Sequence, residues 1–275
     1  MIPVVAHFIT LCDTSFFIQG CSYNVKTIFP FQAVATSYKC DRRSERLCII
    51  INNKTFEGER FRHGSDKDTD DLNELFGRFL GFTVYIYEDQ SAKEIQDLMK
   101  NLKKRRNISQ CSCVVVVILS HGCNEEIEGS DNQGVALKDV TKYLNDVNCP
   151  PLKGKPKVFI VQACRGSDEN DLYFDVDLTS DTTGLVGDSS YTGGVVPNGA
   201  DMLIAFATVS GHVAYRKPTQ GSPFIQKFIE VVRERANDTH LADILLQVNY
   251  AVSSEGVQMP SFIVQLRAHL YLWPM

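Results

Sequence analysis

The sequence predicts an α/β fold with a mostly parallel sheet, and two observations carry that prediction. Short β-branched runs alternate with amphipathic segments over about 120 residues, which is typical of βαβ units. Two of the runs, 113–119 and 157–161, are apolar almost without interruption, as strands buried on both faces are. The right-handed rule for crossovers between parallel strands then places helices on both faces of the sheet.

The individual elements follow in chain order. The helix expected at 91–106 opens with a Ser cap and an early Glu and closes in a basic turn, which suits its dipole. The final stretch, 261–273, has a period close to 2 and is expected to form a long strand whose open edge pairs with another subunit. The other expected strands are 47–53, 82–89, 113–119, 157–161 and 202–209, and the other expected helices are 69–80, 136–147, 222–236 and 240–252.

The composition is that of a globular protein with a substantial core, since 44% of the 275 residues are hydrophobic and 22% are charged. The net charge of −5 leaves no basic field for nucleic acid or anionic lipid. The apolar start lacks a basic residue before Lys26 and is broken by His7 and Asp13, so it is a poor secretory signal and too polar to span a membrane. We expect no nucleic-acid or membrane partner and a cytoplasmic or nuclear location.

The nine cysteines are odd in number and form no C-x-x-C pair. Several lie inside apolar runs, which indicates reduced, buried thiols. Cys111 and Cys113 have no matching His/Cys cluster, and the chain has no Gly-rich phosphate turn of the G-x-G-x-x-G kind. Neither a metal site nor a cofactor is therefore expected, and a doubly wound small-molecule binder is disfavoured.

One cysteine and one histidine each follow a predicted buried strand. Cys164 comes just after the strand at 157–161, and His121 comes just after the strand at 113–119. The carboxyl ends of parallel strands meet at one edge of the sheet, where ligands and chemistry collect. A thiol needs a nearby imidazole or dipole to be an effective nucleophile at neutral pH. Taken alone, a histidine is more often a surface or core residue, so the neighbouring cysteine strand carries this hypothesis.

Five ordered motifs around this pair resemble those of the caspase family. The run QACRG at 162–166 matches the caspase nucleophile signature, together with the histidine of SHG at 120–122. The segments 62–68 (RHGSDKD) and 200–222, followed by FIQ at 224–226 and Met259-Pro260, fit the family as well. The resemblance covers about 39–275. It implies a caspase-like three-layer sandwich, in which a central, mostly parallel, six-stranded sheet carries helices on both faces.

The resemblance also implies a division of the chain and an activity. Residues 1–38 would be a leader or prodomain-like extension, 39–188 the large-subunit region with an acidic intersubunit linker at about 167–200, and 189–275 the small-subunit region. The activity would be that of a cysteine endopeptidase cleaving after Asp, made as a zymogen and activated by cleavage in the linker, in apoptosis or related proteolytic signalling. Its partners would be protein substrates, a second copy of the chain bound through the terminal strand, and other caspases.

The catalytic roles follow from the same resemblance. Cys164 would be the nucleophile and His121 the general acid/base. The backbone N–H groups of Gly122 and Cys164 would form the oxyanion hole, a task that suits glycine because nothing on its Cα blocks close approach.

The substrate pocket is likewise carried over from the family. Arg62, Gln162 and Arg216 would bind the substrate Asp, because two guanidinium forks and an amide can nearly saturate one carboxylate. Without the motifs, each arginine would be interpreted as a solvated surface residue. Tyr215 stands where the family usually has Trp and keeps an aromatic wall, whereas Pro223 replaces a Trp and, with the short segment 253–258, indicates an altered outer subsite.

The linker from Ser167 to Ala200 contains seven acidic residues and no Lys or Arg. A loop of this length within a compact domain is either functional or disordered. Asp188, which precedes Ser189, is the preferred processing site because a small residue and flanking glycines suit an accessible cut; Asp177 and Asp181 come next. The alternative is a solvated acidic loop that is not processed.

A second function remains open beside the protease. A catalytically silent, caspase-like regulator could bind a true caspase and cut nothing. Silent paralogues usually lose the nucleophile, the histidine or an arginine, and this chain keeps all of them, which favours the active enzyme.

Overall fold

The computed structural model describes residues 37–40, 44–123, 125–166, 199–256 and 258–273, and the fold is that of these residues. The main strands are β1 (Glu45–Asn52), β4 (Thr83–Glu88), β5 (Cys111–Leu119), β9 (Lys157–Gln162), β10 (Met202–Phe206) and β11 (Ser261–Val264). Shorter strands are β2 (Thr55–Phe56), β3 (Arg60–Phe61), β6 (Gly122–Cys123), β7 (Glu126–Glu128) and β8 (Gly134–Ala136). The α-helices are α1 (Ser65–Asn73), α2 (Ala92–Asn101), α3 (Leu137–Lys142), α4 (Pro223–Arg235) and α5 (Leu241–Ser253). A π-helix, η1 (Glu74–Phe79), continues α1, and η2 (Leu102–Lys104), η3 (Ile108–Gln110) and η4 (Pro150–Leu152) are 3₁₀ turns.

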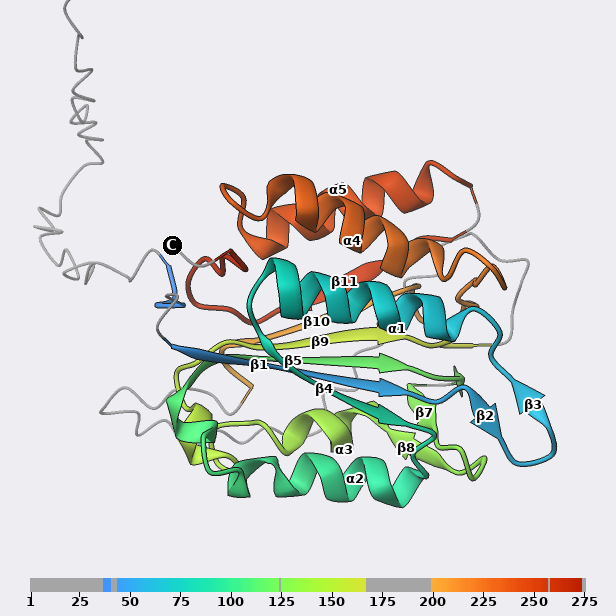
Figure 1. The fold of residues 1–275 in the computed structure, drawn as a ribbon, viewed down its shortest axis with the longest axis horizontal. Coiled ribbons are helices and arrows are strands. Elements are labelled where there is room, and N and C mark those ends of the chain that lie inside the picture. Colours follow the sequence, from blue (N-terminus) through green and yellow to red (C-terminus); the bar gives the residue numbers. More distant parts are fainter. Residues whose placement is uncertain (1–36, 41–43, 124, 167–198, 257, 274–275) are drawn as a thin grey trace, which may run out of the picture. The chain divides into compact units, whose positions relative to one another are not determined.

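Six strands form one sheet in the order β11-β10-β9-β5-β1-β4 (Figure 1). Neighbouring strands from β4 to β10 are parallel, and β11 alone in this sheet runs antiparallel to its neighbour β10. The prediction of a mostly parallel, six-stranded sheet is confirmed. All parallel strands point the same way, so their carboxyl ends lie along one edge.

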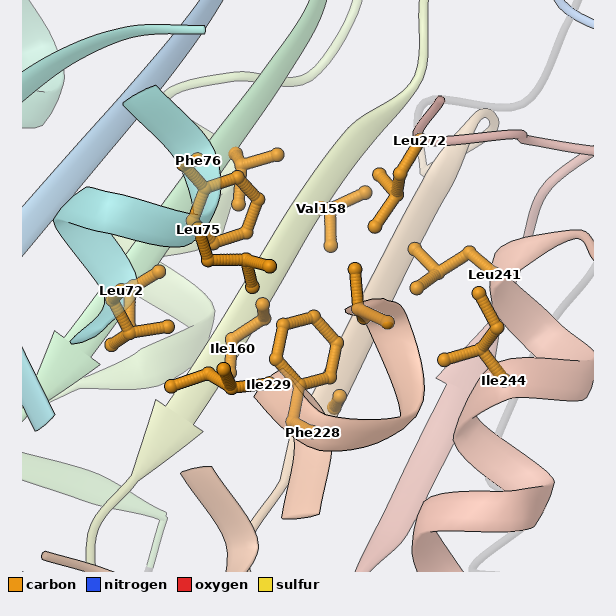
Figure 2. Packing of buried hydrophobic residues seen from close by; sticks show 14 of the residues in the cluster. Leu72, Leu75, Phe76, Val158, Ile160, Phe228, Ile229, Leu241, Ile244 and Leu272 are labelled. Carbon is orange, nitrogen blue, oxygen red and sulfur yellow. The ribbon is translucent and has the colours of Figure 1, made fainter. Parts of the chain in front are cut away.

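Helices cover both faces of this sheet, as predicted. Helices α1, α4 and α5 lie on one face and α2 and α3 on the other (Figure 1). Because side chains alternate along a strand, the apolar residues of β1, β5 and β9 divide between two separate core clusters, one under each layer of helices. In the first cluster, Leu72, Leu75 and Phe76 meet Val158 and Ile160 of β9 together with side chains of α4 and α5 (Figure 2).

The predicted start of the helix after residue 90 is confirmed in detail. The Ser91 hydroxyl accepts the backbone N–H of Glu94 at 3.3 Å, and the Glu94 carboxylate accepts the backbone N–H of Ser91 at 2.9 Å. This reciprocal capping box satisfies two donors that the first turn of a helix leaves open. The helix ends earlier than predicted, at Asn101, and the 3₁₀ turn η2 follows.

The predicted terminal strand is wrong in length, because β11 ends at Val264 and not at residue 273. Beyond it, the Arg267 guanidinium binds the buried Asp201 carboxylate through two hydrogen bonds, of 2.8 and 2.6 Å. Leu270 and Leu272 then pack into the core outside any strand. The alternation of apolar residues in 261–273 therefore has two causes. Residues 261–264 form a strand, and the later apolar residues pack into the core outside a strand.

Other element ends also differ from the predictions. Helix α3 stops at Lys142, and the chain continues in tighter turns, in which the N–H groups of Leu144 and Asn145 donate to the carbonyls of Thr141 and Lys142 at 3.1 and 3.2 Å. The helix predicted at 69–80 begins earlier, at Ser65, and widens into the π-helix η1 from Glu74. The strand predicted at 202–209 ends at Phe206. Within the described residues no helix is long and apolar enough to span a membrane.

The core of the first cluster supports a stability prediction. Phe228 of α4 is fully buried and its ring stacks on that of Phe76, with 6.4 Å between ring centroids. Phe228→Ala is expected to lower the free energy of unfolding by about 3–5 kcal/mol, since apolar contacts are lost and a cavity remains. Chemical denaturation would measure this, with Tyr250→Ala as control. Because Tyr250 is 77% exposed, its loss should change stability by less than about 0.5 kcal/mol. Equal effects of the two substitutions would contradict the packing described.

Candidate active site

The register of the two central strands brings His121 and Cys164 to the same level of the sheet. Strands β5 and β9 are parallel neighbours, and Leu119 is paired with Gln162 at their carboxyl ends. His121 and Cys164 each lie two residues beyond this last pair. They therefore leave the sheet at one edge, on adjacent strands, as the sequence predicts.

Gly122 lies against the backbone of the cysteine loop. A Cβ atom at Gly122 would stand 2.8 Å from the carbonyl oxygen of Cys164 and 2.6 Å from that of Glu126, closer than any side chain tolerates. Only glycine fits between these two carbonyls. Gly122 therefore lies in close contact with the loop that carries Cys164.

The Cys164 loop is held by the segment that follows β10. The backbone N–H of Ala214 donates to Sγ of Cys164 at 3.3 Å. One residue further, the N–H of Arg165 donates to the His212 carbonyl at 2.9 Å and its carbonyl accepts the N–H of Gly211 at 3.0 Å. The thiol is half-buried beneath this segment, in a defined position.

Arg165 anchors the same loop through its side chain, a role that the sequence analysis did not assign. Its Nε donates to the Glu125 carboxylate at 2.9 Å, and its guanidinium lies over the Phe206 ring, 3.9 Å from the centroid. A further N–H donates to the Thr208 carbonyl at 3.3 Å. The arginine of QACRG therefore fixes the residue after the cysteine to the β6–β7 turn and to the end of β10.

His121 sits in a strongly cationic and partly buried environment. Its ring lies 4.8 Å from the Phe56 ring, between centroids. Burial disfavours the charged imidazolium, and the nearby guanidinium groups of Arg62 and Arg60 disfavour it further, so the pKa of His121 falls to about 4. The imidazole is consequently neutral around pH 7 and can accept a proton.

Arg62 is buried and lacks a full set of partners. It is 2% exposed, and its Nη1 donates to the Asn53 carbonyl and to the Ser65 hydroxyl, each at 3.1 Å. Its Nε is buried and has no hydrogen-bond partner among the described residues. Burial, together with the neighbouring charge of Arg216, lowers the pKa of Arg62 to about 9. A buried guanidinium with an open donor is a site that favours an anion.

Arg216 and Gln162 belong to the same cluster. Arg216 donates from Nε to the His63 carbonyl at 2.7 Å, and burial lowers the pKa of Arg216. Gln162 is 1% exposed; its amide N–H donates to the Tyr215 carbonyl at 3.3 Å, while its Oε1 has no described partner. Both arginines also lie close enough to Cys164 to interact electrostatically with it.

Asp68 links the two sequence segments that supply the arginines. Its carboxylate accepts the backbone N–H of Ser222 at 2.9 and 3.0 Å and the Gln226 side-chain amide at 2.9 Å. It also offsets part of the charge of Arg62. Burial raises the pKa of Asp68, against the hydrogen bonds of Ser222 and Gln226, which lower it. The motif RHGSDKD at 62–68 and the run beginning at Ser222 are therefore parts of one structure.

Tyr215 contributes its backbone as well as its side chain. Its N–H donates to the Gln258 side chain at 2.8 Å, and the Gln258 amide donates to the Ala207 carbonyl at 2.9 Å. Tyr215 as a whole is 39% exposed. Gln258 was not predicted as part of the site. The only feature of the sequence that could have pointed to it is its position just before Met259-Pro260.

Two sets of predicted features are not placed by the structure. Asp177, Asp181 and Asp188 lie outside the described residues, as does most of the 1–38 extension. Among the residues that are described, no group of three or more His, Cys, Asp or Glu side chains is arranged to hold a metal ion.

Comparison with known proteins identifies relatives over most of the chain. A family model described as the caspase domain matches residues 45–271. The chain is 36% identical to caspase-7 of Gallus gallus over 250 residues, 85% of this chain and 79% of that protein. It is 34% identical to caspase-3 of Mesocricetus auratus over 273 residues, 92% of this chain and 95% of that protein. It is 32% identical to caspase-8 of Mus musculus over 255 residues, 86% of this chain but only 53% of that protein.

Proposed function

Because this chain belongs to the caspase family, we propose that it is a cysteine endopeptidase that hydrolyses peptide bonds after Asp. The observation that carries the proposal is the arrangement at the carboxyl edge of the sheet. There His121 and Cys164 each lie two residues beyond the end of one of two adjacent strands, near the buried Arg62 and the partly buried Arg216. A thiol, a neutral imidazole and an anion site are the parts that such a reaction needs.

The chemical steps follow from these groups. The Cys164 sulfur gives up its proton to His121 and attacks the substrate carbonyl carbon, forming a C–S bond. The negative charge on the carbonyl oxygen would be bound by the backbone N–H groups of Gly122 and Cys164. Protonated His121 then donates its proton to the leaving amine as the C–N bond breaks. Water, deprotonated by His121, cleaves the thioester and restores the thiol.

The preference for Asp rests on the unused hydrogen-bonding capacity of the pocket. Arg62 has an open Nε, and Arg216 lies beside it with no carboxylate among its described hydrogen-bond partners. A substrate carboxylate would pair with both guanidinium groups and relieve their mutual repulsion. Glu should bind poorly, since one extra methylene overfills the pocket and displaces the carboxylate from the arginines.

We expect cleavage of the linker and dimerisation to stabilise this pocket. Arg216 and Tyr215 follow the acidic linker in the sequence. The part of the pocket that they form therefore depends on the position of the segment after residue 199. Asp188 remains the preferred cut, and N-terminal sequencing of the smaller fragment should read from Ser189. Strand β11 ends the described sheet and exposes Ile263 and Val264, at 49% and 43%, which supports pairing with a second copy.

A series of fluorogenic peptides tests the proposal. Peptides that differ only at the residue before the cut, as Asp, Glu, Asn or Ala, should give rapid hydrolysis with Asp alone. Equal hydrolysis of the Asp and Glu peptides would contradict the pocket. An inert wild-type protein that binds an active caspase tightly would instead support the silent regulator.

The pH dependence offers an independent check on His121. Its ordinary pKa is near 6.5, but here it is about 4, and the residue acts as a base only when neutral. Activity that depends on neutral His121 is therefore retained as pH falls through 6.5 and is lost only near pH 4. We expect kcat/KM between pH 5 and 8 to show no inflection near 6.5.

Substrate binding should raise the pKa of His121. A carboxylate held by Arg62 and Arg216 offsets the charges that depress the pKa of His121, so the acid limb of kcat should lie at higher pH than that of kcat/KM. Steady-state kinetics with the Asp peptide would measure both limbs. A kcat/KM limb centred at 6.5 would show that burial and the neighbouring arginines do not lower the pKa of His121 in the working enzyme.

A further inference from the structure

A second charged cavity lies at the opposite edge of the sheet from Cys164. It encloses about 240 Å³ where β1, β4 and β5 begin, and its walls include Tyr85, Arg105 and Arg106. This is the edge at which the arrows of β1, β4 and β5 start in Figure 1, next to the turns that follow α2. The apolar side chains of Leu47 and Ile108 also line the cavity, so part of its lining is apolar and part is cationic.

The chain around this cavity is strongly basic, in contrast to the protein as a whole. Between Leu98 and Cys123 there is no Asp or Glu, although the net charge of the chain is −5. No ion pair within the described part of the chain uses any of the basic residues of this stretch, which are Lys100, Lys103, Lys104, Arg105 and Arg106. Their positive charge is therefore available to a ligand.

Arg105 is already held in position. Its Nη2 donates to the Tyr87 hydroxyl at 2.7 Å, and its guanidinium lies 3.8 Å from the centroid of the Tyr85 ring. Tyr85 and Tyr87 lie on the same face of β4, so these two contacts hold the guanidinium against that face. An arginine fixed in this way loses little side-chain entropy when it binds a carboxylate.

Strand β4 also presents an unused backbone edge. It is the last strand of the sheet and, within the described residues, pairs only with β1. Two of its large side chains, Tyr85 and Ile86, are each 41% exposed and point to opposite faces because they are neighbours on a strand. An open edge of this kind accepts an extended peptide as an additional strand.

We propose that β4 and this cavity together form a docking site for an extended acidic segment of a partner protein. The segment adds as a strand to the free edge of β4 and places acidic side chains on the same face as Tyr85. Its carboxylates then pair with Arg105 and Arg106. The site lies a full strand length from Cys164, so the inference does not depend on the proposed proteolytic activity.

A peptide fits these features better than a nucleic acid does. Apolar lining residues and an open strand edge offer nothing to a phosphate backbone, whereas both suit alternating side chains of an extended peptide.

Fluorescence polarisation can test the docking site on the full-length chain. The probe is a fluorescein-labelled octapeptide of alternating Thr and Glu, which places every carboxylate on one face of a strand. Wild-type protein should bind it, more weakly as salt rises from about 50 to about 500 mM. Arg105→Glu/Arg106→Glu should raise the Kd at least about tenfold. If the double variant unfolds, the single variant Arg106→Glu replaces it in the test, because Arg106 is exposed and lies outside the core.

Two controls separate the docking site from general attraction. Arg78→Glu/Lys138→Glu makes the same change of charge at exposed positions elsewhere and should leave the Kd within about twofold. A peptide with alternate backbone amides N-methylated keeps its charge but cannot pair with a strand, so it should bind at least about tenfold more weakly. Failure of the wild type to bind, equal weakening by both double variants, equal binding of the methylated peptide, or tighter binding of an oligothymidylate of the same charge would each overturn the proposal.

Discussion

Cys164→Ala is expected to lower kcat/KM for an Asp peptide by at least about 10⁴-fold. In the proposed reaction the sulfur forms the covalent bond to substrate, which the methyl group of alanine cannot do, whereas the remaining groups of the site would still bind substrate. KM or inhibitor affinity should therefore change much less than kcat. Cys164 contributes little to the core, being half-buried just beyond the end of β9, so the variant should fold normally.

Cys123 provides a matched control for this experiment. It is the other described cysteine that is not buried, it is free, and it follows Gly122 in the short strand β6. Cys123→Ala should retain activity within about threefold, because no step of the proposed reaction uses its thiol. Progress curves and thermal unfolding of the three proteins would settle the comparison. Substantial residual activity in Cys164→Ala, or loss of activity in Cys123→Ala, would show that the nucleophile has been misassigned.

Arg62→Ala is expected to lower kcat/KM for the Asp peptide by about 10²- to 10³-fold. In the proposed pocket, removing one guanidinium would leave the substrate carboxylate buried and only partly paired, at a cost of about 2–5 kcal/mol. The same change removes a positive charge that depresses the pKa of His121, so the acid limb of kcat/KM should move to higher pH. A purely structural role for Arg62 would not produce this second effect.

The substitution also removes hydrogen bonds to Asn53 and Ser65, so its effect on folding must be separated from its effect on recognition. The ratio of kcat/KM for the Asp peptide to that for its Asn isostere achieves this, because the fraction of folded enzyme cancels. We expect a large ratio in the wild type that falls by at least about tenfold in Arg62→Ala. Arg78→Ala, at an exposed position, should leave the ratio unchanged. An unchanged ratio in Arg62→Ala would refute the pocket.

Much of the fold and the placement of the site could be predicted from local patterns. The apolar runs at 113–119 and 157–161 indicate strands buried on both faces, because a central strand has room for few polar side chains and those must be paired. The fully buried Lys157 meets this condition, since its Nζ donates to the Asp146 carboxylate at 3.0 Å. Both runs are strands of the sheet, and the residues that follow them, His121 and Cys164, leave it together. The Ser91 capping box was equally predictable, since it involves residues only three positions apart.

Element ends were less predictable where distant residues determine them. The run 261–273 alternates like a strand throughout, yet pairing stops at Val264 because Arg267 reaches the buried Asp201 and Leu270 packs into the core. These partners are far away in the sequence. A local period reports which side chains are buried, and it does not distinguish burial in a strand from burial in an irregular segment.

The sequence by itself determined the order of strands and helices, the residue types at the sheet edge and the family to which the chain belongs. Only the tertiary structure decided how charged the site is and how it is held together. Burial of Arg62 beside Arg216, the neutral state of His121, and the link from Asp68 to Ser222 all join segments separated by long stretches of chain. Desolvation and charge interactions depend on distances in space, and those distances are set only when the folded sheet brings the segments to one edge.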